Sequence, residues 1–286
     1  MGKPLLNRIF RYQIRRVPKQ MIWGTGIFTL VFIMAMIGPY IAPYPFDHMN
    51  LAKRLSPPSA DYWMGTDEYG RDVMSRMLVG GRLSLVMGVG ATLLSMLIGV
   101  PLGLMAGYFR GNLEEIIMRS VDVFMSIPPI LLGLLILAVT PPSLWKTSVA
   151  VGIIYVPIMV RLTRSVTLDV SGEEFVQAAR ARGDRAYYIL GLEILPNAWP
   201  PIIVEGALRV TFAIMIGAAL SFLGLGVQPP SSDWGLMIAE ARPFIHSAPW
   251  IGLAPGIALS ITIIGINLLG DGLRHMLDPR MKPQRS

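Results

Sequence analysis

The run LSLVMGVGATLLSMLIGVPLGLMAGY, from Leu83 to Tyr108, decides the fold class of this chain. It contains no charged residue and is longer than the roughly 20 apolar residues that an α-helix needs to cross a bilayer. Across the chain of 286 residues, 53% are hydrophobic and 15% are charged. A typical soluble domain has roughly 25% charged residues. We therefore expect an all-α, polytopic membrane protein.

Further apolar runs extend this pattern in both directions along the chain. They are Met21 to Pro43, Ile116 to Val139, Ser148 to Leu162, Pro200 to Val227 and Ile251 to Leu269. The sequence thus predicts about six transmembrane helices. Pro128-Pro129 interrupts the run at 116–139, and Pro157 lies within the next run. These prolines are either places where the helices flex or static packing features.

The basic residues predict how the chain is oriented in the membrane. Most of the 25 Lys and Arg lie in segment 1–20, between the second and third spans, in the 167–199 loop and in the tail. By the positive-inside rule these segments face the cytoplasm, so both termini are expected to be cytoplasmic in a bacterial inner (cytoplasmic) membrane. The net charge of +7 then reflects topology and a lipid bilayer partner, and no nucleic acid is expected.

The same features divide the chain into four parts. Residues 1–20 form a basic cytoplasmic segment, and residues 21–82 hold the first transmembrane helix and an external loop. Residues 83–277 form the core transmembrane domain, and residues 278–286 form a cytoplasmic tail.

The 167–199 loop has the pattern of a helical hairpin. Ser171-Gly-Glu-Glu174 has the spacing of a capping box, which predicts that a helix begins there. Gly183 suits the left-handed position after a helix end, and Asp184 can cap a second helix that Pro196 helps to stop. This hairpin at 171–196 is too polar to enter the membrane. It is either a solvated loop or a docking site for a cytoplasmic partner.

Four motifs, in order along the chain, resemble one family of transport proteins. They are Gly65-Thr-Asp-x-x-Gly70-Arg-Asp72 with Ser75-Arg76; Gln177-Ala-Ala-x-x-x-Gly183 with Ile194-Leu195-Pro196; Leu220-Ser-Phe-Leu-Gly-Leu-Gly226 with Gln228-Pro-Pro and Trp234-Gly235; and Asn267-Leu-Leu-Gly-Asp-Gly-Leu-Arg274 with Leu277-Asp-Pro-Arg280. Together they resemble the C-type permease subunit of the dipeptide, oligopeptide, nickel and glutathione ABC importers. The second motif resembles the EAA loop, which serves as the coupling helix in ABC importer permeases.

The resemblance implies a type I ABC importer permease that moves peptides or peptide-like small solutes into the cytoplasm by alternating access. It implies a heterodimer with a second homologous permease, two ATPase subunits and an external substrate-binding protein. ATP and Mg would be bound by the ATPase subunits, and this chain would bind no cofactor and be no enzyme. The implied ATPase-coupling residues are Gln177, Ala178, Ala179, Gly183, Asp184, Leu195 and Pro196. Gln177 stands where the family usually has Glu, so this position has lost a charge.

The external loop motif comprises Gly65, Thr66, Asp67, Gly70, Arg71 and Asp72. Its aspartates suggest either a calcium site or a structured cap on the membrane domain. The alternating acidic ligands of an EF-hand are absent, so we favour the cap and expect no metal.

Polar residues within the spans are candidates for the transport pathway. Glu205 and Arg209 are four residues apart on one helix face and form either an ion pair or part of the pathway lining. For Asp122 we favour a local pair with Arg119 over contact with the solute. Asn267 is either an interhelical hydrogen-bonding residue or a pore residue.

Two other functional classes are open to a membrane chain of this kind. An enzyme is disfavoured, because the sequence has no P-loop, no His-Glu-x-x-His and no Gly-x-Ser-x-Gly motif. The stronger alternative is a secondary transporter or channel that needs no ATPase partner. Such proteins often contain internal repeats, and no convincing repeat is visible here.

Overall fold

The computed structural model describes residues 18–139, 141–231 and 233–277, and these residues form helices joined by loops. The elements are α2 (Lys19–Ile41), η1 (Leu51–Lys53), α3 (Val73–Phe109), α4 (Gly111–Met125), α5 (Pro129–Ala138), α6 (Leu144–Ser171), α7 (Glu174–Ala181), α8 (Ala186–Tyr188), η2 (Ile189–Ile194), α9 (Leu195–Phe222), α10 (Trp234–Ala241), η3 (Arg242–Phe244) and α11 (Trp250–Leu277). Within the described ranges the backbone forms no strand, and the expected all-α class is confirmed. The basic segment 1–20, except for its last three residues, and the tail at 278–286 lie outside these ranges.

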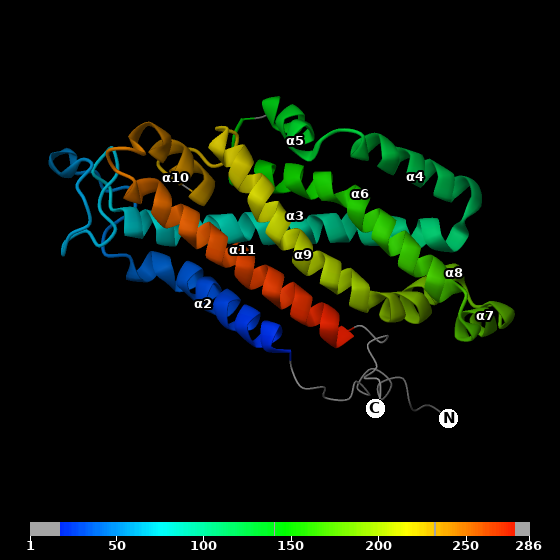
Figure 1. Cartoon of the computed structure of the whole chain (residues 1–286). Helices are drawn as coiled ribbons and strands as arrows, with labels where there is room; N and C mark the ends of the chain where they lie inside the picture. The colour runs from blue at the N-terminus through cyan, green and yellow to red at the C-terminus, as the bar shows by residue number, and fades with distance from the viewer. Residues whose placement is uncertain (1–17, 140, 232, 278–286) are drawn as a thin grey trace.

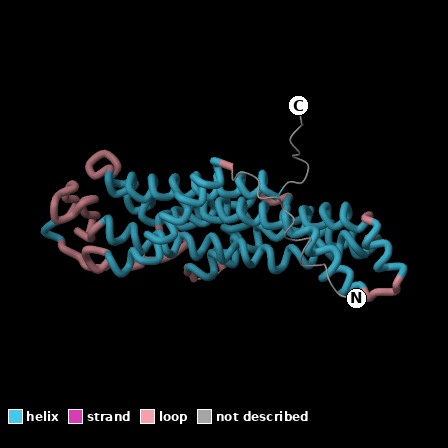
Figure 2. Tube along the Cα trace, turned by 90° about the horizontal axis from the view of Figure 1, so that it is seen from below, coloured by secondary structure: helices cyan, strands magenta, loops and turns pink. Residues whose placement is uncertain are grey.

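The long helices α2, α3, α6, α9 and α11 run side by side along the molecule (Figure 1). Loops gather mainly at the two ends of this elongated bundle, and the larger set lies at one end (Figure 2). That end carries residues 42–72, which we call the cap, together with α10. The opposite end carries α7 and α8, and we call residues 171–196 the hairpin segment.

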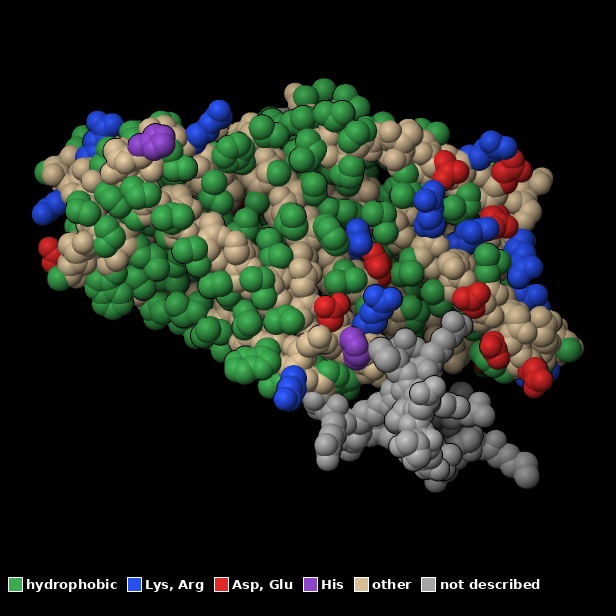
Figure 3. All heavy atoms as spheres, in the orientation of Figure 1, with side chains coloured by type: hydrophobic (Ala, Val, Ile, Leu, Met, Phe, Trp, Pro, Cys, Tyr) green, Lys and Arg blue, Asp and Glu red, His purple; other side chains and the backbone are tan. Residues whose placement is uncertain are grey.

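Among the described residues, five helices are long and apolar enough to cross a membrane, or six if the bent pair α4 and α5 forms one span. The prediction of about six spans is therefore confirmed. Three spans are longer than predicted: α3 begins at Val73 rather than near Leu83, α6 covers 144–171 rather than 148–162, and α11 covers 250–277 rather than 251–269. On the face displayed in Figure 3, hydrophobic side chains cover most of the middle and charged side chains gather toward the ends.

The predicted interruption at Pro128-Pro129 is confirmed. The chain bends by 88° between α4 and α5, with Pro128 as the N-cap and Pro129 as the first residue of α5. Proline suits this position because the first turn of a helix has no intrahelical partner for its N–H groups. Pro157 behaves differently, since α6 continues through it and the residue is buried.

A stripe of glycines brings α3 and α6 together. Gly99, Gly103 and Gly107 are spaced four residues apart on one face of α3. A Cβ atom at Gly103 would lie 2.5 Å from Cβ of Thr163 and 2.7 Å from the carbonyl oxygen of Val160. Small residues at this spacing let helix backbones approach closely in a membrane, where the hydrophobic effect does not drive helices together. The stripe therefore fixes how α3 and α6 pack.

Candidate functional site

The hairpin segment turns at Gly183. This residue has a φ of +78°, which confirms the predicted left-handed conformation. The N–H of Asp184 donates to the carbonyl oxygen of Ala179 over 3.2 Å, and the N–H of Gly183 donates to that of Arg180 over 3.0 Å. These two bonds form a Schellman motif, which satisfies the last carbonyl groups of α7. The turn is thus built by backbone geometry that favours glycine at this position.

Three other predictions about the hairpin segment are wrong. Ser171 is the last residue of α6 and is buried, and the N-cap of α7 is Glu173. Asp184 does not cap the next helix, whose N-cap is Arg185; its carboxylate instead accepts a hydrogen bond from Arg182 over 2.7 Å. Pro196 does not stop a helix, because it lies in the first turn of α9, where proline is tolerated.

The predicted coupling residues divide into a buried set and an exposed set. Ala179 is fully buried and packs with Val176, Ile189 and Ile194. Gln177, Ala178, Gly183 and Pro196 are exposed, whereas Asp184 and Leu195 are half-buried. Ala179 therefore holds α7 against the bundle, and the exposed residues form part of the surface.

The same surface includes apolar side chains that sequence reasoning missed. Tyr187 is 69% exposed and Leu192 is 58% exposed, and Tyr188 is also exposed. Tyr187 and Tyr188 belong to α8 and Leu192 belongs to η2, and α8 lies at the end of the molecule opposite the cap (Figure 1). The run Ala186-Tyr-Tyr-Ile189 could have revealed the two tyrosines, because it places aromatic residues in a polar loop.

In the cap, the carboxylate of Asp67 is the central acceptor. Its Oδ1 accepts from the backbone N–H groups of Tyr69 and Arg71, over 2.8 and 2.9 Å. Its Oδ2 accepts from Nε of Arg71 and Nη1 of Arg76, both over 2.6 Å. All three charged side chains are almost fully buried. Asp67, one of the aspartates that suggested a calcium site, thus accepts hydrogen bonds from two arginine side chains and two backbone N–H groups.

The remaining residues of the external loop motif shape the backbone around this carboxylate. Gly65 and Gly70 have φ of +73° and +72°, and a Cβ at Gly70 would lie 1.8 Å from the carbonyl oxygen of Asn50. Thr66 accepts from the N–H of Ser56 over 2.9 Å. Asp72 caps α3 by accepting from the N–H of Ser75 over 2.8 Å. The expected structured loop is therefore present, and all six motif residues belong to it.

The cap is also tied to α10, a connection that sequence reasoning missed. Nη2 of Arg76 donates to Oε2 of Glu240 over 2.6 Å, which links α3 to a residue 164 positions later. Burial raises the pKa of the neighbouring Glu68 carboxyl, and the charges of Asp67 and Glu240 raise it further. In the part of the chain that the structure describes, no group of three or more His, Asp or Glu side chains is placed to hold a metal ion.

Ion pairs lie on the half of the spans nearer the hairpin segment. Glu205 and Arg209 of α9 are 2.7 Å apart, as their spacing predicted. The guanidinium of Arg209 also lies 4.7 Å from the ring centroid of Phe212. A cavity of about 310 Å³ is lined by Glu205 and by Arg161 of α6. Charged groups from two spans therefore face one cavity.

The predicted pairing of Asp122 with Arg119 is wrong. Asp122 accepts from Nη2 of Arg161 over 2.6 Å, while Arg119 pairs with Glu115 one turn away. The Asp122–Arg161 pair joins α4 to α6 beside the cavity that Glu205 lines. Asn267 is half-buried on α11, and its side chain forms no hydrogen bond with any described residue.

Comparisons with known proteins agree with this architecture. Residues 99–283 match the family of binding-protein-dependent transport system inner membrane components. Residues 19–58 match the N-terminal transmembrane domain of oligopeptide transport permease C. The fold is similar to that of a chain in inward-facing structures of the MetNI methionine ABC transporter, with a TM-score of 0.60 and 20% identity over 70% of this chain and 96% of that one.

Several relatives are similar over almost their full length. The dipeptide transport system permease protein DppC of Alkalihalophilus pseudofirmus is 42% identical, over 92% of this chain and 87% of the relative. The di/tripeptide permease protein DppC of Pseudomonas aeruginosa is 38% identical, over 92% and 89%. The glutathione permease protein GsiD of Pectobacterium atrosepticum is 40% identical, over 91% and 87%. The chain therefore belongs to the family of binding-protein-dependent transport system inner membrane components and is a multi-pass membrane permease subunit of a bacterial ABC importer.

Proposed function

We propose that this permease moves peptides or peptide-like small solutes into the cytoplasm by alternating access. The support is chemical: the relatives described above are named for dipeptides, di/tripeptides and glutathione, all of which contain amide-linked residues and free carboxylates. The importer would contain this chain, a second homologous permease as its heterodimer partner, two ATPase subunits and an external substrate-binding protein. In this arrangement both termini and the hairpin segment face the cytoplasm, and the cap faces the binding protein.

The observation that carries the proposal is the surface of the hairpin segment. Tyr187 and Leu192 are exposed in the hairpin segment, close in sequence to the charged residues Arg185 and Glu193, and exposed apolar groups at such a place favour a protein partner. The exposed Gln177 and Ala178 continue this surface on α7. We assign it as the docking site for an ATPase subunit, which binds ATP and Mg. Ala179, Gly183 and Asp184 hold its shape, and Leu195 and Pro196 connect it to α9.

The charged groups of the spans are proposed to lie along the solute pathway. Asp122 and Glu205 each pair with an arginine beside one cavity, so a zwitterionic solute would meet both signs of charge there. Arg209 is held by Glu205 and by the face of Phe212. Asn267 has unused hydrogen-bonding groups among the described residues, which suits a polar lining.

The experiment compares two leucine substitutions in the complete importer. The four membrane and ATPase subunits are reconstituted in proteoliposomes with the binding protein, and uptake of a labelled dipeptide and ATP hydrolysis are measured together. Leu192→Ser should reduce binding-protein-stimulated hydrolysis and uptake at least fivefold. Leu30→Ser, a control on α2 outside the cap and the hairpin segment, where Leu30 is 63% exposed, should leave both near wild type. Full activity of the Leu192→Ser importer would contradict the docking site, and absence of dipeptide uptake by the wild type would contradict the solute class.

A further inference from the structure

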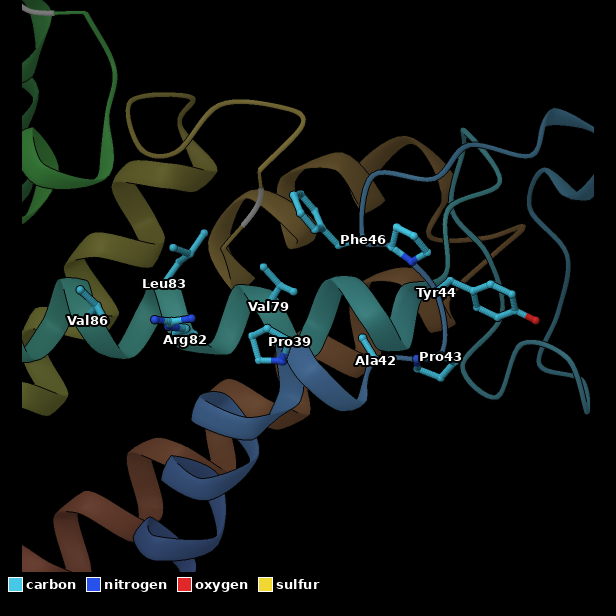
Figure 4. A pocket seen from close by; sticks show the side chains of 10 residues that line it. Pro39, Ala42, Pro43, Tyr44, Phe46, Val79, Arg82, Leu83 and Val86 are labelled. Carbon is cyan, nitrogen blue, oxygen red and sulfur yellow. The ribbon is translucent and has the colours of Figure 1, made fainter.

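A cavity outside the sites described above lies at the cap end, between the end of α2, the start of the cap and the first turns of α3 (Figure 4). Its volume is about 670 Å³, which is within the range of small-ligand sites. Val79, Leu83 and Val86 line it on α3, and Pro39 lines it on α2. Phe46 of the cap adds an aromatic ring, so the walls are mostly apolar, whereas the ring of Tyr44 points away from these side chains and stacks on Tyr62 (Figure 4).

Arg82 is the one charged residue that lines this cavity. It is exposed, and it makes no ion pair and no hydrogen bond with any residue of the described ranges. Arg76, only six positions earlier on the same helix, is buried and paired with Asp67 and Glu240. The positive charge of Arg82 therefore stands uncompensated beside apolar walls.

The position of Arg82 along α3 indicates its depth in the membrane. The helix has 37 residues, so at 1.5 Å per residue it is about 55 Å long, whereas the hydrocarbon core of a bilayer is about 30 Å thick. Arg82 follows Val73, the start of the helix, by about nine residues, or about 13 Å. If the middle of α3 lies at the bilayer centre, Arg82 falls near the boundary between hydrocarbon and headgroups at the cap end. A long Arg side chain at this depth can reach the headgroup layer, where anionic groups are available.

The chemistry of the cavity defines its ligand. A guanidinium group binds carboxylate and phosphate oxygens through two parallel hydrogen bonds, and the apolar walls accept a hydrocarbon or aromatic body. We propose that this cavity binds an anionic oxygen group, carboxylate or phosphate, carried on an apolar body, with Arg82 as the anion-binding residue. Two sources offer this chemistry: the free carboxylate of a peptide-like solute and the phosphate of an anionic lipid. Only the first source rests on the proposed function.

Cysteine labelling tests the site without requiring transport. The chain has no cysteine, so Ala42→Cys places a single thiol in this chain, in the wall of the cavity. The labelling rate with a maleimide is measured on the purified importer in detergent, with cysteine-free partner subunits. The added ligands are the dipeptide Ala-Phe, its C-terminal amide, dioctanoyl phosphatidylglycerol and dioctanoyl phosphatidylcholine. Ala60→Cys, exposed in the cap outside this cavity, is the control thiol.

We expect the dipeptide or phosphatidylglycerol to slow labelling of Ala42→Cys at least tenfold, and the amide and phosphatidylcholine to protect much less. Protection by the dipeptide identifies a solute site, and protection by phosphatidylglycerol identifies a lipid site. Arg82→Gln should abolish protection, Arg82→Lys should retain part of it, and Arg54→Gln, in the cap, should change nothing. Labelling of Ala60→Cys and the unfolding temperature should be the same in all variants.

Three results would overturn the proposal. The first is that neither anionic ligand protects, and the second is that protection persists in Arg82→Gln. The third is that Ala42→Cys is unreactive from the start and Arg82→Gln releases the second permease, which would make Arg82 a subunit-interface residue. If the proteoliposomes took up no dipeptide, the proposed function would be contradicted. Protection of Ala42→Cys by phosphatidylglycerol would still test whether the cavity binds an anionic lipid.

Discussion

The backbone N–H of Asp184 donates a hydrogen bond to the carbonyl oxygen of Ala179 over 3.2 Å, and this bond closes the turn through Gly183. Because Ala179 is buried against the bundle, the bond connects the exposed part of the hairpin segment to a fixed point. The conformation of Gly183 therefore sets the direction in which α8 leaves α7.

Replacing Gly183 by Val should uncouple ATP hydrolysis from transport without preventing membrane insertion. A Cβ at this position meets no atom within 4 Å, so the cost comes only from the left-handed backbone, about 1–2 kcal/mol for a residue with a side chain. Membrane abundance should equal wild type, while stimulation of ATP hydrolysis by the binding protein should fall several-fold. Gly183→Asn is the matched control, because Asn tolerates this conformation, and Gly183→Ala should be intermediate. Wild-type stimulation in Gly183→Val would show that this turn is not critical.

Replacing Arg76 by Gln should destabilise the cap strongly. The change removes the charge that faces both Asp67 and Glu240, and breaking a buried ion pair typically costs about 3–5 kcal/mol. We expect a large drop in unfolding temperature for the purified protein, followed by tryptophan fluorescence, since Trp250 donates to the carbonyl oxygen of Thr66 in the cap.

The control for that change is Arg119→Gln. Arg119 also forms an ion pair with a carboxylate, but both partners are largely exposed, and such pairs contribute only about 0–1 kcal/mol. Its unfolding temperature should stay close to that of the wild type. Equal shifts in the two variants would mean that the cap network does not stabilise the fold.

Replacing Gly103 by Ala should loosen the contact between α3 and α6. The new methyl group would overlap the backbone oxygen of Val160 and Cβ of Thr163, and overpacking of this kind costs about 1–3 kcal/mol. Gly256→Ala in α11 is the matched control, because its Cβ would meet no atom within 4 Å. The unfolding temperature in detergent should fall for the first variant only. A fall of similar size in both would contradict the glycine stripe as the determinant of this packing.

Cysteine labelling in intact cells tests the orientation. Ala60 in the cap and Arg185 in the hairpin segment are both exposed, and the native chain offers no competing thiol. An impermeant maleimide should label Ala60→Cys from outside and should label Arg185→Cys only after the membrane is permeabilised. Labelling of Arg185→Cys in intact cells would reverse the predicted topology.

The sequence by itself determined the features that depend on neighbouring residues. The spans follow from local hydrophobicity, and the bend at Pro128-Pro129 follows from the lack of backbone donors. The pairing of Glu205 with Arg209 follows from the helix repeat, and the left-handed turn follows from Gly183. Each of these features depends on one continuous stretch of sequence, which is about 20 residues long for a span and shorter for the others.

Local patterns failed where a helix continued past its expected end. Ser171 has capping-box spacing, yet it lies inside α6, because apolar and small residues extend that helix along α3. Pro196 does not end the helix that runs from Ala186 to Phe222. The π-helical turn η2 precedes it, and Pro196 lies at the start of α9, so the helix continues past the proline. Tertiary packing overrode the local signal in both cases.

Only the tertiary structure decided which charges from different helices meet. Asp122 pairs with Arg161, 39 residues away, rather than with Arg119, and Arg76 pairs with Glu240, 164 residues away. The tertiary structure also places Arg82 beside an apolar cavity, where it has no partner among the described residues. The physical reason is that an ion pair depends on distance in space, and the approach of α4 to α6 or of α3 to α10 is fixed by the packing of whole helices, which no short stretch of sequence specifies.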